Sequence, residues 1–178
     1  MAEIIYRPLT ESDLYPGSMQ NFQRHQVVTE CWRHTPEGLK LLPIAFVDDW
    51  DDAKRRKREM ELRTLPQRGG IAFGALRDGE LLGYIALAQQ SPDCPADTLE
   101  VLSFHVGEPY RGQGIGKHLF AMAVAEGRRR KMRRLYISSH SAKESYAAYE
   151  HLGCRETQDV LASAVEKEPC DIQREYLL

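Results

Sequence analysis

The sequence predicts a single α/β domain. The chain has 178 residues, which is long enough to bury a sizeable core and short for two domains. Hydrophobic residues make up 42% of the chain and charged residues 28%, as in ordinary soluble globular proteins. Strand-like and helix-like segments alternate along the second half, without an internal repeat or a linker. We therefore expect residues 1–178 to form one domain.

Charge and hydropathy exclude several classes of protein. The formal net charge is −2, so bulk charge gives no reason to expect binding to nucleic acid. The longest apolar runs, such as Leu81–Ala88, are far shorter than the roughly 18 residues of a membrane span. The N-terminus shows no signal-peptide pattern, and the four cysteines are far apart. We expect a cytoplasmic protein with reduced thiols and no bound metal.

The N-terminal third is the least regular part of the chain. Ile4–Arg7 has the pattern of a short strand. Met19–Trp32 and Trp50–Leu65 are expected to be helical, and Pro36 and Pro43 interrupt the chain between them. No catalytic motif is visible in this region.

A β-hairpin is expected in the middle of the chain. Ile71–Arg77 and Leu81–Ala88 are apolar and β-like, and Asp78-Gly79 separates them. An Asp-Gly pair between two apolar runs supplies the positive φ angles of a tight turn. Leu99–Val106 follows as a further strand.

The last third is expected to alternate between helices and strands. Gly153 suits the position that ends a helix in left-handed backbone. The expected elements are a helix over Ile115–Arg130, a strand over Leu135–Ser139, a helix over Ser141–Leu152, and strands over Val160–Val165 and Ile172–Leu177.

A glycine-rich turn between a strand and a helix is the most informative segment. Gly112, Gly114 and Gly116 alternate with other residues within Val106–Lys117. Such a turn aims several backbone N–H groups in one direction, and the following helix adds the positive end of its dipole. The segment is therefore suited to bind a pyrophosphate.

Two common phosphate-binding motifs do not fit this turn. A Walker A motif requires Ser or Thr after Gly-Lys, whereas His118 follows Gly116-Lys117. A dinucleotide fingerprint requires Gly-x-Gly-x-x-Gly, whereas the third glycine here comes one residue too early. Neither a nucleoside triphosphate nor a dinucleotide is favoured.

The sequence Arg-Gly-Gln-Gly-Ile-Gly, preceded by Val106 and Pro109, resembles motif A of the GNAT superfamily of acyl-CoA-dependent N-acetyltransferases. The resemblance implies a mixed, mostly antiparallel sheet with splayed central parallel strands flanked by helices. It also implies an acetyl-CoA-binding core over residues 98–154 and a helical substrate-side region over residues 14–66. The implied cofactor-binding residues are Phe104, His105, Val106, Arg111, Gly112, Gln113, Gly114, Ile115, Gly116 and Lys117.

The same resemblance points to Tyr149 as the general acid. Tyr149-x-x-x-Gly153 is similar to a family pattern in which the tyrosine faces the sulfur of CoA. A phenol stays protonated at neutral pH and can donate to the leaving thiolate. The chain departs from the family pattern at Ala142, where an asparagine is often found, and at Cys154, where an aromatic residue is usual.

The base that removes the amine proton has two candidates. Glu100 lies on the strand before the motif, where many family members keep a glutamate. His105 lies on the same strand and has an ordinary pKa suited to proton transfer. Water could also carry the proton away, so the choice stays open.

The predicted function is transfer of an acetyl group from acetyl-CoA to a primary amine of an unidentified small molecule or peptide. The amine would attack the thioester directly. The alternative is a non-catalytic acyl-CoA-binding sensor or regulatory module. Dimers are common in the family, so the resemblance is also compatible with a homodimer.

Overall fold

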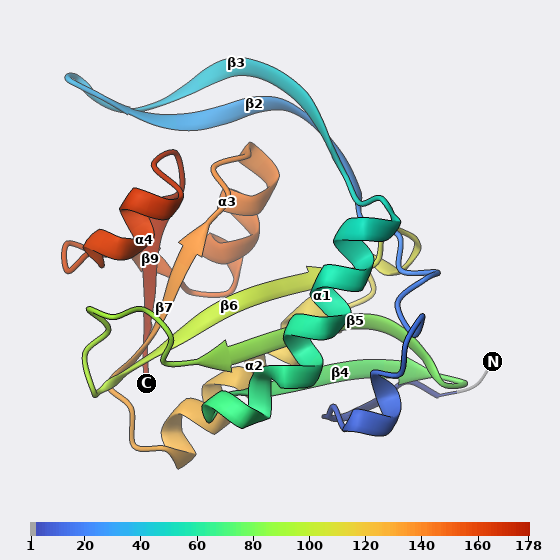
Figure 1. Cartoon of the computed structure of the whole chain (residues 1–178). Helices are drawn as coiled ribbons and strands as arrows, with labels where there is room; N and C mark the ends of the chain where they lie inside the picture. Colours follow the sequence, from blue (N-terminus) through green and yellow to red (C-terminus); the bar gives the residue numbers. More distant parts are fainter. Residues whose placement is uncertain (1–2) are drawn as a thin grey trace. The chain divides into compact units, whose positions relative to one another are not determined.

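The computed structural model describes residues 3–178, which form a seven-stranded sheet and a separate two-stranded ribbon (Figure 1). The order in the large sheet is β1-β4-β5-β6-β7-β9-β8, and the ribbon is β2-β3. The strands are β1 (Ile5–Pro8), β2 (His25–Thr35), β3 (Gly38–Asp49), β4 (Ile71–Arg77), β5 (Glu80–Ala88), β6 (Thr98–Val106), β7 (Arg134–Ser139), β8 (Arg155–Glu156) and β9 (Ile172–Leu177). The α-helices are α1 (Asp52–Thr64), α2 (Ile115–Arg129), α3 (Lys143–His151) and α4 (Ala162–Lys167). No helix within residues 3–178 is both long and apolar enough to cross a membrane.

The large sheet is mixed, as predicted. β6 pairs with β7 in parallel, whereas β4 pairs antiparallel with both β1 and β5, and β9 pairs antiparallel with both β7 and β8. The parallel register joins Thr98–Glu100 to Arg134–Tyr136. β6 continues to Val106 and β7 to Ser139 after the last of these pairs. The central parallel strands are thus joined over only part of their length.

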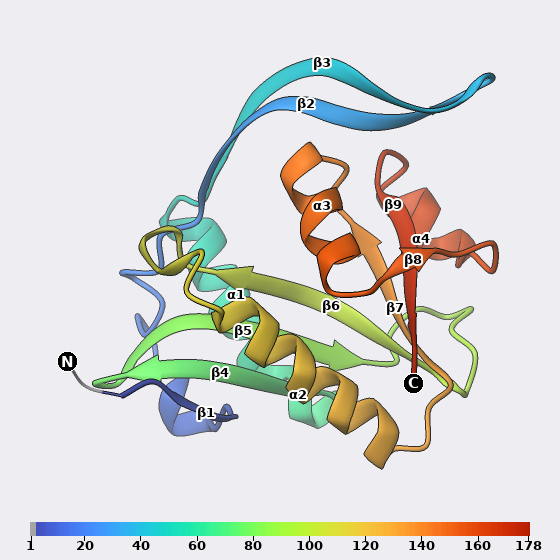
Figure 2. The same ribbon diagram turned by 180° about the vertical axis from the view of Figure 1, so that it is seen from behind.

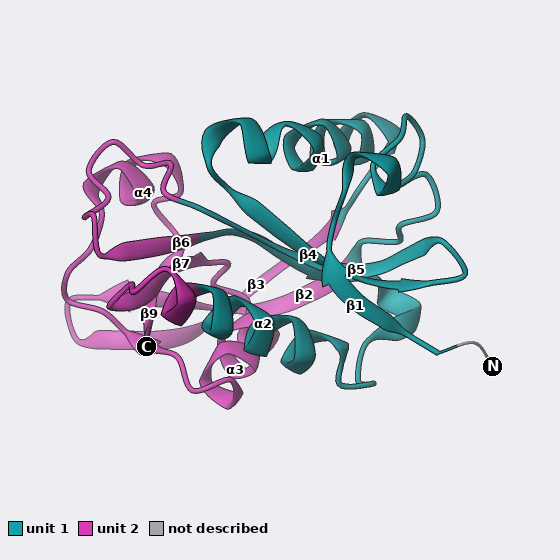
Figure 3. Cartoon of the chain, turned by 90° about the horizontal axis from the view of Figure 1, so that it is seen from below, with its two compact units in different colours: residues 1–25, 49–88, 101–126 teal, residues 26–48, 89–100, 127–178 magenta. Residues whose placement is uncertain are grey.

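The first compact unit comprises the described part of residues 1–25 together with residues 49–88 and 101–126 (Figure 3). In this unit α1 and α2 lie on opposite faces of β4 and β5, and Figure 2 shows α2 running along these strands. Buried apolar side chains fill the α1 side of the unit. They include Leu14, Met19, Phe22, Trp50, Leu62, Leu65 and Tyr84.

The second compact unit comprises residues 26–48, 89–100 and 127–178 (Figure 3). Arg174 on β9 lies over the ring of Tyr146 on α3. Leu161, just before α4, donates its backbone N–H to the Tyr136 hydroxyl on β7 at 3.0 Å. Tyr136 is paired with Glu175, the neighbour of Arg174, and successive strand residues point to opposite faces. Therefore α3 and α4 cover opposite faces of this part of the sheet.

The β4–β5 hairpin confirms the prediction from the Asp-Gly pair. Asp78 and Gly79 have φ angles of 52° and 81°, the left-handed values that such a turn needs. The register pairs Ile71 with Leu87 at one end and Arg77 with Glu80 at the other.

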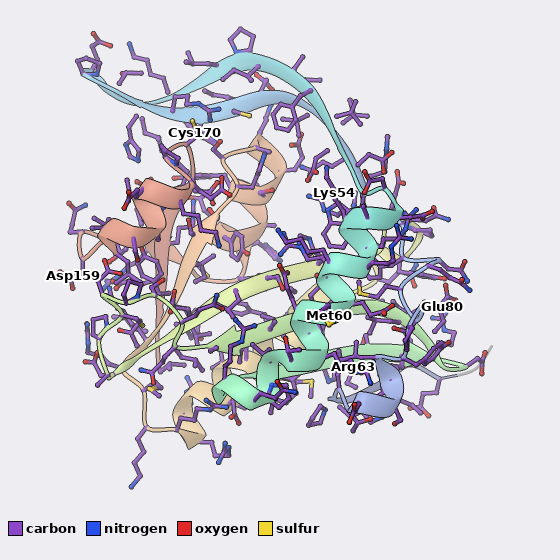
Figure 4. All side chains as sticks on the ribbon, in the orientation of Figure 1. Lys54, Met60, Arg63, Glu80, Asp159 and Cys170 are labelled. Atoms are coloured by element: carbon purple, nitrogen blue, oxygen red, sulfur yellow. The ribbon has the colours of Figure 1, made fainter. Side chains whose placement is uncertain are left out.

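The expected helix over Trp50–Leu65 is confirmed as α1. The Asp51 side chain accepts a hydrogen bond from the Lys54 backbone N–H at 2.8 Å and so caps the first turn. Lys54, Met60 and Arg63 lie along the helix in Figure 4. Met60 is 60% exposed, whereas Leu62 is buried, so α1 presents one apolar face to the unit.

The expected helix over Met19–Trp32 is wrong. Residues 16–21 form turns, and the buried Glu59 carboxylate accepts hydrogen bonds from the backbone N–H groups of Gly17 and Met19. From His25 the chain is the strand β2, whose β-branched residues suit a strand better than a helix. Residues 14–66 therefore contribute a β-ribbon followed by a helix, rather than a helical region.

The β2–β3 ribbon contacts the segment before α3 (Figure 1). Val28 and Cys31 are fully buried against Ala142, and the Trp32 N–H donates to the Ser141 carbonyl at 2.8 Å. Pro43 lies within β3, which is tolerated because both strands of a two-stranded ribbon are edge strands.

The expected strand over Val160–Val165 is also wrong, because this segment begins α4. Short apolar segments fit a strand or a helix equally well by periodicity. Here the Asp93 carboxylate accepts from the Ser163 backbone N–H at 3.1 Å, which stabilises the first turn of the helix. The nearby strand β8 carried no periodic signal because it has only two residues.

A buried ion pair ties three parts of the second unit together. Arg134 is 1% exposed and donates to Glu175 at 3.0 Å, to Thr98 at 3.1 Å and to Thr157 at 3.1 Å. Arg155 donates to the other oxygen of Glu175 at 2.9 Å. The Arg134 guanidinium therefore has hydrogen-bond partners that offset its removal from water.

We predict that Arg134→Met lowers the free energy of unfolding by about 3 kcal/mol, because it leaves the buried Glu175 carboxylate without its buried partner. Arg133→Met is the matched control, since Arg133 is exposed and pairs with exposed Asp97. Urea unfolding measures both variants. Equal stability of the two variants would contradict the structural role of the Arg134 pair.

Candidate functional site

The turn between β6 and α2 has the geometry of an anion-binding site. Gly112 and Gly114 have φ angles of 74° and 81°, which favour glycine. A Cβ at either position would meet no described atom within 4 Å, so the outer side of the turn is open. The first helical hydrogen bond runs from His118 N to the Gly114 carbonyl at 3.1 Å. The N–H groups at the start of α2 thus lack acceptors within the helix and can bind an anion.

Arg111 braces this turn through its side chain. Its Nε donates to the Val106 carbonyl at 3.3 Å, and its Nη1 donates to the His25 carbonyl at 2.9 Å. Both contacts join the turn to strand ends of the first unit. Arg111 is exposed, and its guanidinium is used within the protein to fix the backbone that follows it.

The third glycine of the motif lies where α2 packs on β6, and a Cβ there would make ordinary van der Waals contacts. A Cβ at Gly116 would lie 3.5 Å from the Phe104 ring and 3.7 Å from the Val106 side chain. The Phe104 ring centroid is 6.2 Å from that of Phe120 on α2. Close packing of this helix on the strand fixes the direction in which the start of α2 points.

His105 lies in an aromatic and cationic environment. Its ring centroid is 4.8 Å from that of Trp50, in an edge contact, and 5.6 Å from that of Tyr84. Burial is the largest cause that lowers the pKa of His105, to about 3, and three positive charges add to it. These charges belong to Arg24, Arg58 and Arg111. His105 is therefore neutral at physiological pH and is a weak base.

Glu100 is held by the loop that follows β5. Its carboxylate accepts from the backbone N–H groups of Gln90 at 2.6 Å and Ser91 at 2.8 Å. The Ser91 hydroxyl donates to its other oxygen at 2.5 Å. Glu100 is 7% exposed, so these contacts account for much of its hydrogen-bonding capacity.

Tyr149 lies on α3 next to the helix end that the sequence predicts. The Cys154 N–H donates to the Tyr149 carbonyl at 2.9 Å, and Gly153 has a φ angle of 87°. Burial is the largest cause that raises the pKa of Tyr149 above its ordinary value; Cys154 and Asp171 raise it further, and Arg174 lowers it. The phenol is therefore protonated at neutral pH.

The predicted site residues fall into two groups. The cofactor-binding residues between Phe104 and Lys117 form one continuous segment of the first unit, whereas Glu100 and Tyr149 belong to the second unit. Sequence reasoning missed Arg174, a buried residue of β9 that acts electrostatically on Tyr149. A single arginine in a strand gives no sequence signal, because its burial depends on the packing of α3.

The comparisons with known proteins agree with this geometry. The model of the acetyltransferase (GNAT) family matches residues 28–154. No curated protein sequence matches the chain at a significant level.

Solved structures share the fold. A candidate streptothricin acetyltransferase from Bacillus anthracis, in complex with acetyl coenzyme A, has a TM-score of 0.71 at 14% identity and covers 99% of both chains. PaiA N-acetyltransferase from Thermoplasma acidophilum, in complex with coenzyme A, has a TM-score of 0.64 at 19% identity, again over 99% of both chains. Ribosomal-protein-alanine N-acetyltransferase from Brucella melitensis has a TM-score of 0.60 at 22% identity, over 98% of this chain and 99% of that one. By the family match over residues 28–154, this chain belongs to the GNAT family of acetyltransferases.

Proposed function

We propose that the protein transfers an acetyl group from acetyl-CoA to a primary amine, and that residues 1–178 act as one catalytic domain. The observation that carries the proposal is the open glycine turn at the start of α2. Two solved structures with the same fold were obtained with acetyl coenzyme A or coenzyme A, which supports this choice of acyl donor.

The cofactor pyrophosphate would lie against the backbone N–H groups from Arg111 to Gly116. The space outside Gly112 and Gly114 is open, so two phosphates can reach the backbone there. Lys117 is exposed at the same helix start and would add positive charge. Backbone groups of Phe104, His105 and Val106 would pair with the pantetheine arm.

The proposed reaction needs two proton transfers: the amine loses a proton, and the thiolate of CoA gains one. The neutral amine forms a C–N bond to the thioester carbonyl carbon, and the C–S bond then breaks. Tyr149, protonated in the free protein, would give its proton to the departing thiolate. The proton from the amine would pass to Glu100, directly or through water. The low pKa of His105 makes its imidazole a weak proton acceptor.

The proposal specifies the acetyl acceptor only as a primary amine. Among the solved structures named above, one is called a streptothricin acetyltransferase and another a ribosomal-protein-alanine N-acetyltransferase, so they point to no common acceptor. Small amines and peptides are therefore tested together, with release of the CoA thiol as the common signal.

We predict that acetyl-CoA and CoA, each at about 1 mM, raise the Tm by several degrees, whereas ATP and NAD do not. A ligand at about 100 times its Kd adds roughly 2.7 kcal/mol of stability. Gly114→Glu should abolish the shift, because a carboxylate then occupies the anion-binding turn. Gly79→Glu is the matched control, since Gly79 has the same φ of 81° and the same open surroundings. A larger shift with ATP or NAD would contradict the assignment of the turn to CoA.

We predict that Tyr149→Phe lowers kcat for acetyl transfer by about 100-fold, because the thiolate loses its proton donor. Tyr146→Phe should keep most of the activity, since the Tyr146 hydroxyl donates to Glu156 at 3.1 Å and has no proposed part in the reaction. Thiol release over a panel of amines measures both variants. CoA binding without thiol release from any amine would support a non-catalytic acyl-CoA-binding module instead.

We predict that His105 makes the protein less stable as the pH falls from about 6.5 toward 3. The unfolded histidine, with an ordinary pKa of about 6.5, takes up a proton in this range, while the folded one, with a pKa of about 3, stays neutral. The unfolded state then binds more protons, so acid favours unfolding. Urea unfolding should show a weaker loss of stability for His105→Gln between pH 7 and pH 4.5. Parallel curves for the two proteins would show that His105 titrates normally.

A further inference from the structure

Arg174 is a buried cation that pairs with no carboxylate of the described chain. Its side chain is 1% exposed, and its Nη1 donates to the Cys154 carbonyl at 3.3 Å. Within residues 3–178, neither its Nε nor its Nη2 has a hydrogen-bond partner, and no carboxylate oxygen lies within 4 Å of the guanidinium. A charge removed from water in this way lowers the stability of a fold unless hydrogen bonds or an opposite charge compensate it.

The same unit contains a second buried arginine, Arg134, whose charge is paired with a carboxylate. Arg134 is equally buried, yet it has Glu175, Thr98 and Thr157 as partners. Arg134 therefore shows how this fold accommodates a guanidinium whose role is structural. Arg174 has one hydrogen-bond acceptor and the face of one aromatic ring, so no opposite charge among the residues that the structure describes balances its own.

The guanidinium of Arg174 faces a tyrosine of α3. Its central carbon lies 3.9 Å from the centroid of the Tyr146 ring, within the range of a cation–π contact. Tyr149 follows Tyr146 by three residues, so the two side chains are neighbours on one face of the helix. Arg174 thus lies on the side of α3 that carries the proposed acid.

We propose that Arg174 is a positioning residue whose buried charge stabilises the phenolate that Tyr149 becomes during acetyl transfer. This inference rests on the proposed function. As the C–S bond breaks, the sulfur takes the electron pair, and the O–H proton of Tyr149 moves to the sulfur. The phenol oxygen is left with a negative charge, and the nearby guanidinium offsets it until a proton from solvent restores the phenol.

The electrostatic effect of Arg174 on Tyr149 favours the phenolate, as the proposed role requires. Burial raises the pKa values of both Tyr149 and Cys154, and the charge of Arg174 lowers both. A cation in a buried setting acts on a nearby anion more strongly than it would in water. A guanidinium neutralised by a carboxylate of its own would lose most of this effect, so the stabilisation depends on the charge being uncompensated.

The test compares Arg174→Met with Arg174→Lys in the full chain. Arg174→Met should lower kcat about tenfold while leaving the KM for acetyl-CoA unchanged, because only the charged product form of Tyr149 is affected. Arg174→Lys, which keeps the charge, should recover much of the rate. The Tm of Arg174→Met should be equal to or above that of the parent, because an unpaired buried charge is replaced by an apolar chain of similar length.

A double-mutant cycle with Tyr149→Phe tests whether Arg174 affects kcat through Tyr149 or by another route. In the Tyr149→Phe background no phenolate forms, so Arg174→Met should cause no further loss of kcat. Arg134→Met is the control, and it should lower the Tm without changing kcat at a temperature where it is folded. These differences in Tm and kcat distinguish a functional buried charge from a structural one.

Three results would overturn the inference. The first is a lower Tm or an unfolded Arg174→Met, which would assign Arg174 a structural role. The second is a loss of kcat on Arg174→Met that is as large in the Tyr149→Phe background as in the parent. The third is a parental rate for Arg174→Met when Tyr149→Phe is slow, which would leave the proposed acid intact. A parental rate for Tyr149→Phe itself would instead remove the proposed acid, and the present inference with it.

Discussion

Arg134 lies where β6 and β7 pair in parallel, and the ladder there covers only Thr98–Glu100. The guanidinium joins the first residue of that ladder to Glu175 on β9, so one buried contact holds three strands in register. After the ladder ends, the backbone of β6 is free of β7 pairing and runs to Val106 and the glycine turn. The paired part of β6 belongs to the second unit, whereas the residues from Val101 to the glycine turn belong to the first unit.

Much of the fold could be predicted from local signals. Asp78-Gly79 needs positive φ angles, and the turn over Gly112 and Gly114 needs them too, so both were visible in the sequence. The helix over Met19–Trp32 failed because contacts distant in sequence decide that region. The Glu59 carboxylate holds the turns at Gly17 and Met19, and Ala142 covers the buried side of β2. Neither contact leaves a periodic pattern in the segment itself.

The candidate site likewise has residues that local sequence indicates and residues that depend on distant contacts. The residues of the glycine turn are contiguous, so spacing alone indicated them as a group. Glu100 stood out only as an acid on a strand, and its hydrogen bonds to Gln90 and Ser91 became visible with the loop in place. Arg174 gave no signal, because an arginine on a short C-terminal strand is usually exposed. Its burial results from the packing of β9 against α3.

The β2–β3 ribbon has a consequence for local motion. Its contacts with the rest of the second unit lie near α3. Val28 and Cys31 pack against Ala142, the Trp32 ring lies 4.9 Å from that of Tyr146, and Glu30 pairs with Lys143, while Val27 and Val47 are exposed. Opening the ribbon would expose Val28 and Cys31 to water and would break the hydrogen bond from the Trp32 N–H to the Ser141 carbonyl, so the ribbon is held most firmly beside the start of α3. Protection of its amide hydrogens from exchange should therefore be greatest beside Ala142 and should fall toward the outer part of the ribbon. A change in the outer part of the ribbon is correspondingly tolerated by the rest of the fold.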